Sequence, residues 1–524
     1  MAEPYYITTA ISYPNGRPHI GHAYEAIAAD VIARAARARG CDVRFQTGTD
    51  EHGLKMAQKA RDLGVEPRAL ADEMSSYFRD MCDRLQVSYD RFIRTTDADH
   101  HAACAAIWQA MEARGDLYLG RYEGWYSVRD EAFYGDEELV EGEGRERLSP
   151  QGTPVEWTVE ESWFFRLTRY QQPLLDLYRD NPDFIRPESR RNEMVRFVEG
   201  GLTDLSVSRT SFDWGVPVPG APGHVMYVWV DALTNYLTGL GYPDMGEAGR
   251  FWPADVHLIG KDIVRFHAVY WPAFLMSAGL PLPKSVFGHG FLLNRGQKES
   301  KSLGNVTDPL ALADRFGVDV LRYFLIRDVS FGQDGSYSPE AIVTRANAEL
   351  ANSFGNLAQR TLSLIFKNCE GWLPAIHGHD EADAALFRQV ADAVQIAMPA
   401  AYERLALSQA CECWIQAVFA CNAYIDEQAP WALRKTDPER METVLATLYI
   451  CIAQLAVAVG PVIPASSTRL LDAMGVDPAL RDFAGIGSHW YSPLAEGGFR
   501  LDQPQGIFPR LELPSVESPA PGAK

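Results

Sequence analysis

Blocks of apolar and polar residues follow one another along the first 50 positions in an order that predicts a strand, a helix and a second strand. Residues 5–13 are rich in aromatic and β-branched side chains, which favour a buried strand, and the turn-forming run Pro14-Asn15-Gly16 follows them. Apolar residues then recur at a spacing of four between positions 27 and 35, and residues 43–47 form the next apolar run. A strand, a helix and a strand in this order predict a parallel pair with a right-handed crossover, the beginning of a doubly wound α/β fold.

The same order of elements returns later in the chain. Residues 256–259 and 285–288 are predicted to be strands, and the apolar pattern of residues 265–278 predicts a helix between them. Residues 115–223, which lie before this second set, have a less regular periodicity and are expected to form an inserted domain. After Pro339, long Ala- and Leu-rich amphipathic patterns predict a helical bundle.

These patterns divide the chain into consecutive segments. We expect the first half of a Rossmann-type doubly wound parallel sheet at 1–114, an inserted connective domain at 115–223, the second half of the sheet domain at 224–295, a loop and connecting region at 296–345, an all-α helical domain at 346–480 and a tail at 481–524. From Pro514 onward the tail is so rich in Pro and Ser that we expect it to be disordered.

Composition excludes several classes of protein. Hydrophobic residues make up 47% of the 524 residues and charged residues 23%, which fits a globular protein and excludes wholesale disorder. The N-terminus has no cationic segment followed by an apolar run, and no uninterrupted apolar stretch approaches the roughly 18 residues of a membrane span. We therefore expect a cytoplasmic protein without a membrane partner. Because the net charge is −20, a nucleic-acid partner would need a local basic surface, and we expect no DNA partner.

The strongest chemical signal is the run His19-Ile20-Gly21-His22, at the predicted junction of the first strand and the first helix. Histidines at i and i+3 share a helix face, and in a first turn unpaired N–H groups and the helix dipole favour phosphate. Gly16 and Gly21 allow a nucleotide to approach the backbone closely. Attack of a carboxylate on an α-phosphate needs donors that stabilise the developing charge, and imidazoles are suitable. The competing interpretation is that the histidines only cap or pack.

A second signal is the run Lys298-Glu299-Ser300-Lys301-Ser302, which lies between Gly296 and Gly304. Two lysines in a loop flanked by glycines can close ammonium groups on a triphosphate and open again to release pyrophosphate. A short Lys/Ser run is more often a solvated surface loop. Its position after the predicted strand 285–288 favours phosphate binding.

Together the two runs resemble the HIGH and KMSKS motifs of the class I aminoacyl-tRNA synthetases, and most closely those of the methionyl-tRNA synthetase family. The resemblance extends from about residue 5 to residue 476. It implies an ATP-dependent ligase that uses ATP with Mg²⁺ to form methionyl-adenylate and then transfers L-methionine to the 3′ end of initiator and elongator tRNA-Met. By this resemblance His19 and His22 contact ATP, and Lys298 and Lys301 stabilise the transition state. Glu299 departs from the motif, and its carboxylate should weaken the attraction of the loop for phosphates.

The resemblance also implies the residues that bind the two small substrates. The implied ATP contacts are Gly16, Gly21, Gly260, Asp262, Ser300, Lys301 and Ser302, with Asp262 placed to accept from ribose hydroxyls. The implied methionine contacts are Ile11, Tyr13, Asp50, Trp229, Ala232, Leu233, Tyr236, Ile263, His267 and Trp271.

Chemistry suggests separate roles within the methionine set. Asp50 is expected to bind the ammonium group, and Tyr13 and His267 are expected to donate to the thioether sulfur. Ile263, His267 and Trp271 recur at a spacing of four, so one helix face would present all three, although core packing explains the same spacing. Because shape alone distinguishes one methylene by only about 1–3 kcal/mol, homocysteine should enter the pocket and require chemical rejection.

An RNA-reading surface is expected in the helical domain. Asn356 and Arg360 lie at i and i+4, where they can offer an amide edge and a planar fork to an unstacked base, and Trp431 can stack on it. These positions resemble the family's reader of the CAU anticodon, which makes 346–480 the anticodon-binding domain and 296–345 the motif loop with a stem-contact region. On spacing alone, Asn356 and Arg360 fit an ordinary exposed helix face.

The cysteines bear on metal binding. Many relatives carry zinc knuckles in the inserted domain, but residues 115–223 contain no cysteine, so we expect no structural zinc and no other bound metal. Aromatic packing around Trp125, Trp157 and Trp163 is expected to hold that domain together. Cys411 and Cys413 are one residue apart in a predicted helix and point to different faces. The chain leaves no room for a C-terminal dimerising domain, so we expect a monomer.

Three alternatives remain open at this point. Glu299 makes a catalytically impaired tRNA-binding paralogue possible, which would show no methionine-dependent exchange of pyrophosphate into ATP. A small-molecule nucleotidyltransferase could use the same histidine motif, but it would not need a helical domain of this size. Within class I, activation of leucine or isoleucine is the nearer competitor.

Overall fold

The computed structural model describes residues 2–129, 132–142, 146–298, 306–487 and 489–513. The chain forms two compact units. Residues 4–29 and 43–290 make up the first, which we call the sheet unit, and residues 1–3, 30–42 and 291–524 make up the second, which we call the helical unit.

A six-stranded sheet lies at the centre of the sheet unit. Its order is β3 (Arg91–Arg94), β2 (Asp42–Thr49), β1 (Pro4–Thr9), β13 (Val256–Gly260), β14 (Val286–His289) and β9 (Ile185–Arg186). The pairs β2–β3, β1–β13, β13–β14 and β14–β9 are parallel. This confirms the doubly wound fold and the return of its second half after an insertion. The order places β1 beside both β2 and β13, the position where ligands of such sheets bind beyond the carboxyl ends of the strands.

The helices of the sheet unit are α2 (Leu54–Leu63), α3 (Pro67–Arg84), α4 (Ala98–Ala113), α5 (Gln171–Asp180), α6 (Glu188–Glu199), α7 (Val228–Thr238) and α8 (Trp271–Ala278). Helix α1 (Ile20–Ala38) begins in the sheet unit and ends in the helical unit. Aromatic and aliphatic side chains from α4, α7 and α8 form one continuous core with the strands, and Trp108, Leu237 and Trp271 lie at its fully buried centre.

The helix predicted at 265–278 is not a uniform α-helix. A π-helical turn, η6 (Phe266–Tyr270), precedes α8. Pro272 has no N–H to donate to the carbonyl of Ala268, four residues earlier, and the Tyr178 hydroxyl donates to that carbonyl instead, at 2.7 Å. The segment that carries His267 is therefore wound more widely than a spacing of four implies.

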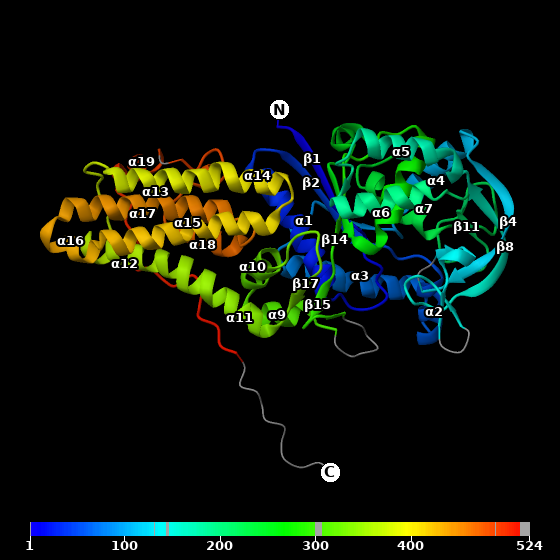
Figure 1. Ribbon diagram of the computed structural model, residues 1–524, viewed down its shortest axis with the longest axis horizontal. Coiled ribbons are helices and arrows are strands. Elements are labelled where there is room, and N and C mark those ends of the chain that lie inside the picture. Colours follow the sequence, from blue (N-terminus) through cyan, green and yellow to red (C-terminus); the bar gives the residue numbers. More distant parts are fainter. Residues whose placement is uncertain (1, 130–131, 143–145, 299–305, 488, 514–524) are drawn as a thin grey trace, which may run out of the picture. The chain divides into compact units, whose positions relative to one another are not determined.

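The inserted region contains a four-stranded antiparallel sheet in the order β10 (Leu205–Ser206), β8 (Glu156–Phe165), β4 (Leu117–Ser127) and β5 (Ala132–Tyr134). The two long strands, β4 and β8, pair over ten positions and stand out in cyan in Figure 1. Trp125 and Trp157 meet edge to face across this pair at 5.4 Å, and Trp163 packs on Trp108 of α4 at 6.1 Å. The expected aromatic packing around these tryptophans is confirmed.

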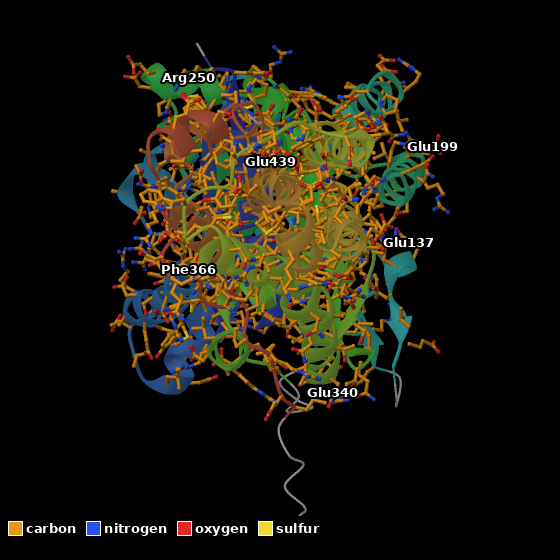
Figure 2. All side chains as sticks on the ribbon, turned by 90° about the vertical axis from the view of Figure 1, so that its left-hand side faces the viewer. Glu137, Glu199, Arg250, Glu340, Phe366 and Glu439 are labelled. Carbon is orange, nitrogen blue, oxygen red and sulfur yellow. The ribbon has the colours of Figure 1, made fainter. Side chains whose placement is uncertain are left out.

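The helical unit carries the bundle that the amphipathic pattern predicts. Its main members are α9 (Pro309–Phe316), α10 (Val318–Asp328), α11 (Pro339–Arg345), α12 (Asn356–Asn368), α13 (Glu381–Ala391), α14 (Met398–Glu403), α15 (Leu407–Gln428), α16 (Pro430–Thr436), α17 (Pro438–Val459) and α18 (Pro464–Ala473). Helices α12, α13, α15 and α17 run alongside one another in Figure 1. Figure 2 looks along these helices from the end marked by Glu439, and side chains fill the space between them.

Helix α17 is the one described helix that is long and apolar enough to cross a membrane by composition. Within its most apolar window 94% of the residues are buried by the rest of the protein. Its apolar character is therefore that of a core helix, with Leu448, Tyr449 and Ile452 fully enclosed by its neighbours.

The segment after residue 480 packs on the helical unit as far as residue 513, rather than forming a free tail. It contains the short helix α19 (Tyr491–Glu496), and Tyr491 donates from its hydroxyl to the carbonyl of Pro374 at 2.7 Å. Further along, Leu511 exchanges hydrogen bonds with the side chain of Asn347. The expected disorder from Pro514 onward concerns residues that lie outside the described ranges.

The end of α1 belongs to the helical unit because a buried ion pair holds it there. Asp30 and Arg322 of α10 are both fully buried and 2.6 Å apart. Arg322 also donates to the carbonyls of Pro461 and Val462, in the turn between α17 and α18. The partner of Asp30 thus lies 292 positions along the chain.

Candidate active site

The junction between β1 and α1 brings His19 and His22 together. Their ring centroids are 3.8 Å apart, and both side chains are half-buried. The Nδ1 atom of His19 accepts from the backbone N–H of Gly21 at 3.1 Å, and Nδ1 of His22 accepts from the backbone N–H of His19 at 3.1 Å. Both imidazoles thus cap the first turn of α1, as the competing interpretation of the sequence suggested.

Capping and phosphate binding are compatible in this arrangement. Because Nδ1 accepts in each ring, the proton of each neutral imidazole is on Nε2, which makes Nε2 the donor atom. A Cβ atom at Gly21 would lie 2.9 Å from Cε1 of His19, so any larger residue there would displace the His19 ring from the helix end. The local structure therefore supplies two N–H donors at the positive end of a helix dipole.

Two further charged groups lie beside these histidines and were not predicted from the sequence. His289, at the end of β14, donates from Nε2 to the Glu25 carboxylate at 2.9 Å and from Nδ1 to the carbonyl of Gly290 at 2.8 Å. Burial alone lowers the pKa of His289, but the Glu25 carboxylate outweighs it and raises that pKa above its ordinary value. Glu25 follows His22 by three positions on the same face of α1, which is the signal that could have found it.

The predicted adenosine contacts lie at the carboxyl end of β13. A Cβ atom at Gly260 would come within 2.8 Å of Oδ1 of Asp262, so this glycine leaves room for the carboxylate. The charge of Asp262 raises the pKa of Glu25, and a hydrogen bond from the backbone of Gly260 lowers it, although burial has the largest effect and raises that pKa. The structure thus brings Gly260 and Asp262 to the end of α1 that carries His22. Gly16, in the turn before α1, is half-buried.

Most of the predicted methionine residues meet around Tyr236 of α7. Its ring lies 5.7 Å from that of His267 and 6.0 Å from that of Trp271, and Trp229 lies 6.0 Å from His267. Ala232 and Leu233 are buried on the same helix, and Ile263 packs against the same core. Burial raises the pKa of Tyr236, and the charges of Glu25 and Asp50 raise it further, which places both carboxylates within electrostatic reach of this cluster.

His267 differs from its predicted role as a donor to sulfur. Its Nδ1 donates to the carbonyl of Ile263 at 3.0 Å, and its Nε2 accepts from the Tyr236 hydroxyl at 2.6 Å. Burial lowers the pKa of His267 to about 4, so the ring is neutral near pH 7 and both nitrogens are already engaged. The sequence could not reveal this, because it does not show which way either nitrogen points.

The remaining predicted residues of the methionine set lie on the loops after β1 and β2. Asp50 is buried, and its backbone N–H donates to the carbonyl of Ser12 at 2.9 Å, beside Ile11. The Tyr13 hydroxyl accepts from the backbone N–H of Met56 at 3.0 Å, and Tyr13 packs against the small core cluster that contains Met56 and Ala60 of α2. Tyr13 therefore contacts α2, whereas the aromatic cluster is built on α7.

The lysine loop begins at a short β-pair. Strand β16 (Gln297–Lys298) pairs with β15 (Leu292–Asn294), which accounts for the backbone of Lys298. Glu299, Ser300, Lys301 and Ser302 lie outside the described residues. Convergence of the loop with His19 and His22 stays a prediction.

The predicted anticodon residues lie together in the helical unit. The Arg360 guanidinium lies 5.3 Å from the centre of the Trp431 ring, and Arg360 donates to Asp426 at 2.8 Å. Trp431 is 47% exposed, which is unusual for a tryptophan, and Asn356 is exposed one helical turn before Arg360. An exposed aromatic face beside a guanidinium can stack an unpaired base.

Comparison with known families gives this geometry a context. Residues 5–362 match the family described as tRNA synthetases class I (M), and residues 373–512 match the anticodon binding domain of methionyl tRNA ligase. The chain belongs to the methionyl family of class I tRNA synthetases. These matches confirm the resemblance to this family and the predicted fold class.

Relatives and solved structures agree over nearly the whole chain. The methionine–tRNA ligase of Brucella suis biovar 1 is 59% identical over 509 residues, which cover 97% of this chain and 98% of that protein. The methionine–tRNA ligase of Mycobacterium tuberculosis H37Rv is 54% identical over 518 residues, which cover 98% and 99%. A solved structure of the M. tuberculosis methionyl-tRNA synthetase in complex with methionyl-adenylate has a TM-score of 0.93 and 53% identity, over 97% of this chain and 100% of that one.

Proposed function

We propose that this chain is a methionine–tRNA ligase that forms methionyl-adenylate from methionine and ATP and then transfers methionine to tRNA. The observation that carries the proposal is full-length identity of 59% to a methionine–tRNA ligase, joined to a solved relative that binds methionyl-adenylate. The impaired binding paralogue has no comparable support, because these relatives are methionine–tRNA ligases over nearly their whole length.

In the activation step the methionine carboxylate attacks the α-phosphate of ATP and pyrophosphate leaves. His19 and His22 donate from Nε2 to the phosphate oxygens on which charge develops, assisted by the dipole of α1. Lys298 and Lys301, with Ser300 and Ser302, close on the triphosphate. Mg²⁺ enters with ATP as part of the substrate and screens the same charge.

Adenosine lies at the carboxyl ends of β1 and β13 in this proposal. Asp262 accepts from the ribose hydroxyls, and Gly16, Gly21 and Gly260 let the nucleotide approach the backbone. We add Glu25 and His289 to the predicted set. A Glu25 carboxylate held by His289 can accept from a second sugar hydroxyl without carrying an uncompensated charge.

Methionine fills the space beside Tyr236, with Asp50 facing its ammonium group. The pocket walls are Ile11, Trp229, Ala232, Leu233, Ile263 and Trp271, and they favour an unbranched thioether by shape. Because both nitrogens of His267 are engaged, we assign its function to holding the Tyr236 hydroxyl in place rather than to donating to sulfur. Tyr13 stays the proposed donor. Homocysteine is then distinguished from methionine mainly by chemistry after activation.

The RNA partner is tRNA-Met, initiator and elongator alike, read through its CAU anticodon by Asn356, Arg360 and Trp431. The protein acts as a cytoplasmic monomer and needs no structural zinc. Support for the last point is chemical, because the inserted domain, residues 115–223, offers no cysteine ligand.

A two-step experiment tests this proposal. The purified chain is mixed with labelled methionine and ATP without tRNA, and bound adenylate is counted per enzyme. We expect about one adenylate per chain, which transfers to tRNA-Met when that RNA is added but not to a tRNA with another anticodon. His22→Gln should slow adenylate formation, whereas His377→Gln, which alters an exposed histidine paired with Glu442, should not. Adenylate that never transfers to tRNA-Met would refute the ligase, and a chain that binds tRNA-Met but forms no adenylate would favour the paralogue.

A further inference from the structure

A cluster of buried polar groups lies on the face of α7 that does not carry Tyr236. Asp231 is fully buried, and its two carboxylate oxygens accept from different histidines. Oδ2 accepts from Nδ1 of His52 at 2.6 Å, and Oδ1 accepts from Nε2 of His100 at 2.6 Å. Burial by itself raises a carboxyl pKa, but the two histidines outweigh it and hold the pKa of Asp231 well below its ordinary value.

Hydrogen bonds fix the orientation of the His100 ring. Its Nδ1 lies 2.9 Å from the hydroxyl of Thr238, which donates to the carbonyl of Thr234 at 3.1 Å. Both oxygens of the buried Asp231 carboxylate thus have a hydrogen-bond partner, which is the condition for keeping this group in the core.

The second histidine connects this cluster to the loop after β2. His52 follows Asp50 by two positions, and its ring packs edge to face on Trp214 at 5.3 Å. The backbone of the same loop is held by Trp214, whose indole donates to the carbonyl of Glu51 at 2.7 Å and whose carbonyl accepts from Gly53 at 3.2 Å. Asp231 thus links this loop to α7.

A metal site is the other function that a His, Cys and Asp cluster could serve, since Cys104 lies 3.3 Å from His100. Two ligands of one tetrahedral zinc stand roughly 3.3 Å apart, because each lies about 2.0 Å from the ion. Here Nε2 of His100 and Oδ1 of Asp231 are 2.6 Å apart, which is the length of a hydrogen bond and too short for two ligands of one zinc ion. Burial also raises the pKa of the Cys104 thiol well above its ordinary value, so the cluster does not stabilise a thiolate by itself.

We propose that Asp231 is a positioning residue for methionine, which sets the distance between the ammonium-binding carboxylate of Asp50 and the aromatic pocket on α7. The pocket residues Trp229 and Tyr236 flank Asp231 on one helix, and His52 lies on the loop of Asp50. One carboxylate therefore fixes both ends of the substrate site without touching the substrate. The proposal rests on the proposed function, because it assigns the role within that methionine site.

The test compares methionine with 4-(methylthio)butanoate, which has the same side chain and carboxylate but no amino group. Asp231→Asn should raise the KM for methionine in pyrophosphate exchange by about 10- to 100-fold, the effect of losing a hydrogen bond to a charged group. In the same variant, the KM for ATP and the inhibition constant of the analogue should both stay within about twofold of their wild-type values. A loss of similar size for methionine and for the analogue would overturn the proposal, because it would show a merely distorted pocket.

Two controls keep the outcome interpretable. His52→Asn removes one hydrogen bond and leaves Asp231 paired with His100, so it should reproduce the selective loss even if Asp231→Asn folds poorly. Asp116→Asn alters a buried carboxylate of the same unit whose partners are Tyr170, Arg169 and Ser277, and it should lower stability without changing the KM for methionine.

Two further outcomes would overturn the inference. One stoichiometric metal ion in the purified wild-type chain, lost in His100→Gln, would assign the cluster to metal binding. If the KM for methionine is unchanged in both Asp231→Asn and His52→Asn, Asp231 does not position the methionine site. If the wild type itself shows no methionine-dependent exchange, the proposed function fails first, and the two failures are thereby distinguished.

Discussion

Replacement of Trp431 by alanine is the sharpest perturbation of the proposed anticodon surface. Trp431 is 47% exposed with the Arg360 guanidinium 5.3 Å from its ring, so it offers a face on which a base can stack. Stacking of one base on an aromatic side chain contributes about 1–3 kcal/mol. At about 1.4 kcal/mol per factor of ten, Trp431→Ala should raise the KM for tRNA-Met in aminoacylation by roughly 5- to 150-fold. Pyrophosphate exchange without tRNA should not change.

The helical unit offers a matched control. Trp372 is 48% exposed and has the Arg500 guanidinium 5.5 Å from its ring, so it repeats the exposure and the cation–π geometry at another place. Trp372→Ala should leave the KM for tRNA-Met unchanged, and Trp431→Phe should retain part of the stacking. Equal effects of Trp431→Ala and Trp372→Ala, or no effect of either, would refute the assignment of Trp431 to the anticodon.

Three other predictions concern the lysine loop, the buried ion pair of Asp30 in α1, and His267 of the methionine pocket. Lys301→Ala should lower the rate of adenylate formation by orders of magnitude in single-turnover assays while leaving methionine affinity nearly intact; an equal loss in both would show that the loop acts elsewhere. Arg322→Met should lower the free energy of unfolding in urea by about 3 kcal/mol, since it leaves Asp30 buried, and Arg322→Met with Asp30→Leu should recover most of that loss; no recovery would contradict the ion-pair argument. Burial lowers the pKa of His267 from 6.5 to about 4, so the contribution of the neutral ring to stability is complete above pH 6.5 and is lost as the pH falls toward 4. The free energy of unfolding, measured against pH, should therefore lose up to about 3 kcal/mol of its acid dependence in His267→Gln. An unchanged pH profile would argue against a buried neutral ring.

Local sequence signals predicted the beginning of the fold and the position of the histidine motif. The turn at Pro14 and the apolar spacing between residues 27 and 35 concern neighbours in the chain, and β1, α1 and β2 form close to where these signals place them. The motif then lies at the strand-to-helix junction because the turn residues and the helical periodicity on either side of it are local signals.

Contacts between distant residues account for what the sequence could not predict. The Glu25–His289 pair joins residues 264 positions apart, and the Asp231–His52 bond joins residues 179 positions apart. Hydrophobic periodicity identifies the buried face of each element but not the polar atom that will face it. For the same reason, the winding of η6 follows from Tyr178, which satisfies the carbonyl that Pro272 leaves without a donor.

The most direct test of the whole account is the amino-acid-dependent exchange of labelled pyrophosphate into ATP. Its rate is compared with methionine, homocysteine, leucine or isoleucine as the amino acid. An aromatic pocket that accepts an unbranched side chain, beside two imidazoles that bind phosphate, should give fast exchange with methionine and slower exchange with homocysteine. Leucine and isoleucine should give no measurable exchange. Absence of exchange with methionine, or faster exchange with a branched amino acid, would contradict the account.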